Sequence, residues 1–170
     1  MTYSDEDPPS SALWDFATTL YRQPDVERAL LTLQDDAGLD IPLLLALLQA
    51  GRLGCPVEPE SLAAMLAAAH RWQEAAIGPL RKARRALARP IEGFPTEPRE
   101  MLRTQIKSAE IEAERLLLLR LEELISAGRG EEPGAAIRSN LGAYLTALNL
   151  ALKEEHGALL ADLALAAQQA

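Results

Sequence analysis

The sequence is poor in the residues that build β-sheets. Ile and Val together account for nine of the 170 residues, and aromatic residues for 4%. Strands favour β-branched and aromatic side chains, whereas the 32 Leu and 30 Ala of this chain are strong helix formers. The composition therefore predicts an all-α protein, a compact bundle of about six to eight helices.

Disulfide and metal frameworks are excluded by the near absence of cysteine and histidine. Cys55 is the single cysteine, which rules out an internal disulfide and a multi-cysteine zinc site. Neither His70 nor His156 follows a glutamate by three residues, so the paired Glu-x-x-His ligands of a di-iron bundle are missing. We expect no cofactor and no metal, and no catalytic residue emerges from a motif.

The chain also has no long apolar run. The longest nearly continuous one covers residues 41–48, far short of the roughly 20 residues that a membrane span needs. Residues 1–9 are acidic and contain two prolines, and they have no basic and apolar regions like those of a secretory signal. We expect a flexible acidic leader at 1–9 and a cytoplasmic protein. The net charge of −8 argues against a nucleic-acid partner, whose binding rests on neutralising phosphates.

The apolar periodicity predicts how the chain is organised. A main helical domain covers 10–127, with a buried central helix at 41–49 that is apolar nearly all round. Prolines mark a linker at 90–98, and a long helix follows over about 98–126 with Leu102 and Leu116 at core spacing. A C-terminal extension over 133–170 contains a second long helix, about 135–155, and a short tail after Gly157. The two long helices are expected to pair.

Several short sequence patterns resemble one known family. They are Leu13-Trp14-x-Phe16, Tyr21-x-x-Pro24-x-Val26, Trp72-Gln73, Arg84-Arg85 and Lys107-x-x-Glu110-x-Glu112-Ala113-Glu114. Together they resemble the bacterial domain-of-unknown-function 2390 family of small helical proteins, over about residues 10–125. The resemblance implies an all-α cytosolic protein, and it transfers no catalytic residue.

Charge is segregated along the chain. Residues 71–89 carry six of the 17 basic side chains and one acidic side chain, so this stretch is +5 and the remainder is −13. At 100° per residue, a basic stripe forms from Arg81, Lys82, Arg85 and Arg89, with Arg84 on the same helix. Such a stripe suits an acidic partner or a phosphate, but internal ion pairing is the favoured interpretation.

Two acidic clusters carry the charge opposite to that of the basic stripe. Asp35 and Asp36 lie in the last turn of a predicted helix, where carboxylates oppose the helix dipole. We therefore predict that at least one of them pairs with an arginine between positions 81 and 89. Glu110 and Glu114 are like charges at i,i+4. They form either a solvated face or a carboxylate pair that meets the basic stripe.

Two function classes follow. The first is a non-enzymatic interaction or regulatory protein that uses the basic stripe and the acidic clusters to contact a protein partner or a second copy. The alternative is a phosphate or diphosphate binder, or an isoprenoid-type enzyme, that uses Arg81, Arg84 and Arg85 with Asp36 and Glu110. Gly38 speaks against the enzyme, because it should end the helix between Asp36 and Asp40. A concave site shared by the arginines and the acids would favour this alternative class.

Overall fold

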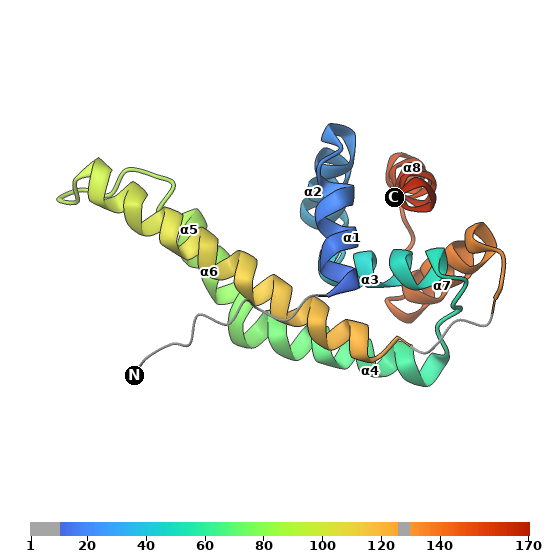
Figure 1. Ribbon diagram of the computed structural model, residues 1–170. Coiled ribbons are helices and arrows are strands. Elements are labelled where there is room, and N and C mark those ends of the chain that lie inside the picture. The colour runs from blue at the N-terminus through green and yellow to red at the C-terminus, as the bar shows by residue number, and fades with distance from the viewer. Residues whose placement is uncertain (1–10, 126–129) are drawn as a thin grey trace.

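The computed structural model describes residues 11–125 and 130–170, and in these ranges it contains helices and connecting turns but no strand (Figure 1). The predicted all-α class is therefore confirmed. The leader predicted at 1–9 lies outside the described residues. In chain order the elements are α1 (Ala12–Tyr21), α2 (Pro24–Ala37), α3 (Ile41–Arg52), α4 (Pro59–Trp72), a π-helical turn η1 (Gln73–Ile77), α5 (Gly78–Ala86), α6 (Thr96–Glu123), α7 (Pro133–Ala147) and α8 (Glu154–Gln169).

The central helix α3 confirms the prediction for 41–49. Every residue from Ile41 to Gly51 is buried, and α3 contacts α1, α4, α6, α7 and α8. Asp40 caps its N-terminus, because Oδ1 of this residue accepts a hydrogen bond from the Leu43 amide at 2.9 Å. Near the other end, a Cβ on Gly51 would lie 2.6 Å from the backbone of Ile137. Glycine thus lets α3 and α7 approach closely.

The C-terminal helices differ from the prediction. The helix expected over 135–155 ends at Ala147, and Gly157 lies inside α8 instead of before a tail. Asn149 explains the early end: its φ is +50°, and the next amide, of Leu150, donates to the Leu145 carbonyl at 3.0 Å. A left-handed residue followed by such a bond is a common helix stop, and asparagine can fill this position in place of glycine. α7 packs on α3 and not along α6, which differs from the expected pairing of the two long helices, and α8 packs on α2 and α7.

Helices α5 and α6 pair side by side and project from the other helices as an arm (Figure 1). The proline-rich segment predicted as a linker at 90–98 connects these two helices, and its last residues already belong to the first turn of α6. Leu102 and Leu116, predicted in the core, are 47% and 46% exposed. In Figure 1 the N-terminal end of α6 has only α5 and the segment that connects the two helices beside it, which agrees with the exposure of Leu102 in this part of α6.

The chain stays helical from α4 into α5 despite Gly78 and Pro79. The π-helical turn η1 connects the two helices directly before these residues, and Pro79 has no amide hydrogen to donate. A Cβ on Gly78 would lie 2.7 Å from the Gln73 carbonyl oxygen, so glycine is needed there. In the part of the chain that the structure describes, no helix is both long and apolar enough to cross a membrane.

Candidate functional site

Arg81 ties α5 to two carboxylates of α6. Its Nε donates to Glu110 Oε1 at 2.9 Å, and its Nη2 donates to Glu114 Oε1 at 2.9 Å. The Glu110 side chain is 6% exposed and that of Arg81 is 16% exposed. The i,i+4 glutamates are thus a carboxylate pair that meets the basic stripe, and the solvated-face alternative does not hold for Glu110.

Arg84 completes the neutralisation of Glu110. Its Nε lies 2.5 Å from Glu110 Oε2, and its Nη2 lies 3.2 Å from Oε1 of the same carboxylate. One glutamate therefore accepts hydrogen bonds from two guanidiniums one helical turn apart. Charge-assisted, forked contacts of this kind are among the stronger hydrogen bonds in proteins.

The pairing predicted for Asp35 or Asp36 is confirmed at Asp35. Arg85 Nη2 lies 2.8 Å from Asp35 Oδ1, which joins α5 to the end of α2. Both side chains are more than half exposed. Asp36 is exposed and makes no ion pair with another described residue. Internal pairing, the favoured interpretation of the stripe, therefore holds for Arg81, Arg84 and Arg85.

The two glutamates of the cluster have pKa values that move in opposite directions. Burial disfavours the charge of Glu110, yet the hydrogen bonds from Arg84 and Arg81 outweigh it and hold the pKa of Glu110 below its ordinary value. At Glu114 burial dominates, the neighbouring Glu110 adds to it, and the pKa is raised despite Arg81. The pKa of Arg84 is raised, chiefly by its hydrogen bond to Glu110. The cluster thus holds one firmly ionised and one poorly solvated carboxylate.

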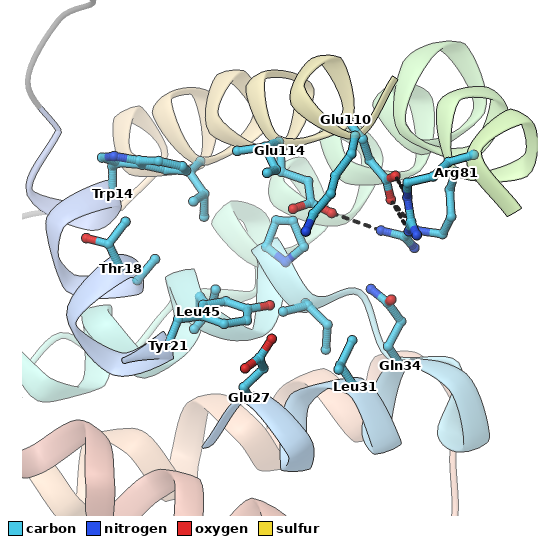
Figure 2. Close-up of a pocket in the computed structure, with 17 residues that line it drawn as sticks. Trp14, Thr18, Tyr21, Glu27, Leu31, Gln34, Leu45, Arg81, Glu110 and Glu114 are labelled. Carbon is cyan, nitrogen blue, oxygen red and sulfur yellow. Dashed lines mark hydrogen bonds and ion pairs between the residues drawn. The ribbon is translucent and has the colours of Figure 1, made fainter. Parts of the chain in front are cut away.

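A cavity of about 470 Å³ opens beside this cluster, between α1, α2, α3, α5 and α6 (Figure 2). Its apolar wall includes Trp14, Leu31, Leu45, Ile111 and Leu118. Its polar groups include Tyr21, Glu27, Gln34, Arg81, Arg84, Lys107, Glu110 and Glu114. We call it the interhelical pocket. Arg81 and Arg84 therefore converge with Glu110 on a concave site, whereas Asp36 does not line it.

Trp14 and Tyr21 of α1 both line the interhelical pocket. The Arg115 guanidinium carbon lies 5.5 Å from the ring centroid of Trp14. Burial and the carboxylates of Glu114 and Glu27 raise the pKa of Tyr21, so its hydroxyl stays protonated at neutral pH. The walls of the pocket thus combine a rigid aromatic surface with a neutral hydroxyl.

Asp40 lies near the polar end of this site and is held from three directions. Besides capping α3, it accepts a hydrogen bond from Gln73 Nε2 at 2.7 Å, and its amide donates to the Tyr144 hydroxyl at 3.1 Å. Burial raises the pKa of Asp40, although the bonds from Leu43 and Gln73 oppose this. Gln73 belongs to η1, so the π-helical turn directs an amide at the α3 cap.

Other predicted site residues lie outside the pocket. Lys82 and Arg89 are exposed and make no ion pair with another described residue. Gly38 has a φ of +69° and ends α2, so Asp36 and Asp40 do not project from successive turns of one helix. This removes the basis for an aspartate-rich motif of the isoprenoid-synthase kind.

Sequence patterns missed several pocket residues. Glu27, Leu31, Gln34 and Ile111 come from solvent-facing positions of α2 and α6, where nothing in the helical period distinguishes a pocket wall from a free surface. Among the residues that the structure describes, no group of His, Cys, Asp and Glu could hold a metal ion. Cys55 is buried, and burial raises the pKa of its thiol, which disfavours the reactive thiolate.

The comparisons with known proteins agree with the resemblance seen in the sequence. No curated protein and no solved structure matches the chain. A family model described as protein of unknown function (DUF2390) matches residues 12–121, which is more than half of the chain and includes every residue that lines the pocket. The chain belongs to the DUF2390 family.

Proposed function

We propose that this protein binds a small amphipathic organic molecule in the interhelical pocket. The observation that carries the proposal is the cavity of about 470 Å³, a volume within the range of about 300–1,000 Å³ that is typical of ligand sites. Its wall combines apolar side chains with charged and hydrogen-bonding ones, so it offers an organic ligand both an apolar surface and groups that fix its orientation. Five helices contribute to it, so a bound molecule would hold the arm against the other helices.

A phosphate or diphosphate ligand has less support. Arg81 and Arg84 already donate to Glu110 and Glu114, so an anion would have to compete with carboxylates for both guanidiniums. Arg85 and Asp36, which that hypothesis also uses, do not line the pocket. An amphipathic molecule that lies on the apolar wall binds without breaking any ion pair of the cluster.

The test is ligand-observed NMR on the full chain with a mixture of small amphipathic fragments. Ile111→Trp places a larger side chain at the pocket wall, at a position that is 44% exposed and so tolerates the change. Leu116→Trp is the matched control, because Leu116 is also on α6 and 46% exposed but does not line the pocket. We expect fragments to bind the wild type and Leu116→Trp and to lose binding in Ile111→Trp.

Two results would overturn the ligand-binding function. One is the absence of any fragment that binds the wild type at millimolar concentration. The other is binding that Ile111→Trp leaves unchanged, because the fragments would then occupy another place.

Interaction with a protein partner is a second candidate, and it rests on the tip of the arm. Phe94 is 68% exposed and Met101 is 62% exposed, in the part of the chain that also carries Lys82 and Arg89. Exposed apolar side chains beside basic ones suit an acidic partner surface. Phe94→Ser with Met101→Ser should abolish co-purification of such a partner without altering the fold. Retention of every partner by this double variant would exclude the tip as the contact.

A further inference from the structure

Three oxygen-bearing groups converge in the interhelical pocket from three different helices. They are the Tyr21 hydroxyl of α1, the Glu27 carboxylate of α2 and the Glu114 carboxylate of α6, and Figure 2 shows them pointing into the same hollow. Neither Tyr21 nor Glu27 makes a side-chain hydrogen bond or ion pair to another described residue. Glu114 Oε1 accepts a hydrogen bond from Arg81, which leaves Oε2 of the same carboxylate for a ligand.

The pocket wall carries three carboxylates, of Glu27, Glu110 and Glu114, and an equal number of cations, of Arg81, Arg84 and Lys107. Arg84 and both Glu110 oxygens are engaged with each other, and Arg81 is shared between Glu110 and Glu114. Among the described residues of the wall, this leaves the Glu27 carboxylate and the Lys107 ammonium, and one oxygen of Glu114, Oε2, without a hydrogen bond. The Tyr21 hydroxyl remains protonated and can accept a hydrogen bond while it donates one to a carboxylate. The Glu27 carboxylate and Glu114 Oε2 are therefore the carboxylate acceptors that the arginines leave open to a ligand.

The apolar wall lies next to these acceptors. In Figure 2 Leu45 lies beside Tyr21, Trp14 lies farther along α1 beyond Thr18, and Leu31 lies on the other side of Glu27. A ligand that reaches the acceptors with one end must therefore lay its other end along aromatic and aliphatic side chains. An organic cation on such a site gains from the carboxylates, and an ammonium donates up to three hydrogen bonds.

We propose that the interhelical pocket selects an organic amine with an apolar body. The ammonium lies between Glu27 and Glu114 against the Tyr21 hydroxyl, and the hydrocarbon lies on Trp14 and Leu45. This inference rests on the proposed function, because it names the ligand class of the same pocket.

Three probes of nearly equal size separate the alternatives: 2-phenylethylamine, 2-phenylethanol and phenylacetate. Isothermal titration and amide chemical shifts of the full chain at pH 7 give the affinities and the place of binding. We expect the amine to bind at least about tenfold more tightly than the alcohol, since hydrogen bonds to charged groups exceed neutral ones by this margin. Phenylacetate should bind more weakly than the alcohol.

The variant that tests the mechanism is Glu27→Gln, at an exposed position of α2 whose carboxylate makes no hydrogen bond or ion pair with another described residue. We expect it to remove most of the amine preference and to leave the binding of 2-phenylethanol unchanged. Asp25→Asn is the control, because Asp25 lies on the same turn of α2 but not in the pocket. It should preserve the tenfold preference.

The outcomes distinguish this inference from the proposed function. Equal binding of the amine and the alcohol, lost in Ile111→Trp, would overturn the amine selectivity and keep the pocket as a ligand site. A preference for phenylacetate, or an unchanged amine preference in Glu27→Gln, would also overturn it. Failure of all three probes to bind counts against the inference, and failure of the wider fragment mixture counts against the proposed function as well.

Discussion

Asp35 and Arg85 are 50 residues apart in the chain, and their side chains meet at 2.8 Å. The contact joins the last turn of α2 to α5 and so links the arm to the other helices. Asp35 carries its charge at the helix end where a carboxylate is unfavourable, and Arg85 compensates it. A carboxylate at the unfavourable end of a helix thus marks a contact with a residue far away in the sequence.

The Asp35–Arg85 pair should contribute little to the free energy of unfolding. Both side chains are more than half exposed, so solvent and salt screen the attraction. We expect Asp35→Asn to lower the unfolding free energy by less than about 1 kcal/mol in urea titrations. Asp36→Asn, next to it and exposed, should not lower the unfolding free energy, because it removes an uncompensated carboxylate from the helix end. If Asp35→Asn lowered the unfolding free energy by the same amount in 1 M salt, the pair could not be a screened surface ion pair.

Glu110 should be the most sensitive residue of the charged cluster. Glu110→Gln removes the charge that two guanidiniums share, and these arginine side chains are only 16% and 26% exposed. We expect a loss of about 2 kcal/mol, less than for a fully buried pair because some solvent reaches both arginines. Glu112→Gln is the control on the same helix, since its contact with Arg115 is 4.0 Å long and Glu112 is 57% exposed. Equal losses in the two variants would exclude a special role of Glu110.

The two glutamates should give opposite pH dependences of stability. The folded-state pKa of Glu110 is lowered from 4.5, so its stabilisation is complete above pH 4.5 and is lost as the pH falls through the lowered pKa. The folded-state pKa of Glu114 is raised, so its contribution is complete below pH 4.5 and is lost as the pH rises through the raised pKa.

Urea titrations from pH 3 to pH 7 test this difference. The stability advantage of the wild type over Glu110→Gln should grow as the pH rises, and the advantage over Glu114→Gln should shrink. Parallel curves for the two variants would show that the carboxylates are in equivalent environments.

Two glycines in packed helices should respond in opposite directions to alanine. Gly51→Ala places a Cβ 2.6 Å from the Ile137 backbone, and we expect a loss of about 1–3 kcal/mol because α3 and α7 must move apart. Gly142 lies inside α7 with open space around its Cβ position. Gly142→Ala should therefore raise stability by about 0.5–1 kcal/mol. Thermal unfolding of both variants measures these changes in stability. A stabilising effect of Gly51→Ala would contradict the close approach of α3 and α7.

The fold was largely predictable where a local signal and the burial pattern agree. Residues 41–48 are apolar on every side, which places α3 in the centre without knowledge of its neighbours, and Asp40 and Gly38 mark helix ends by chemistry that acts within a few residues. Asn149 shows the limit of such signals. Asparagine adopts a left-handed conformation less often than glycine, so the end of α7 is not evident from the residue type.

The candidate site was predictable only in part. The opposite charges of the aspartates and the arginines indicated the contact at Asp35, because a small chain offers each charged side chain few oppositely charged partners. The burial of Glu110 and the pocket wall at Ile111 depend on how α6 is rotated against α5 and α1. Helical periodicity states which residues share a face but not which neighbour covers that face.

The π-helical turn η1 determines how α5 is rotated about its axis relative to α4. Each residue of a helix advances the chain by about 100° around the axis, and a π-helical turn holds one residue more than the α-helical turn it replaces. Removal of one residue from Gln73–Ile77 would therefore turn α5 by about a quarter of a revolution and carry Arg81 and Arg84 away from Glu110. The length of this segment matters to the site as much as the identity of its charged residues, so insertions and deletions there are more damaging than substitutions.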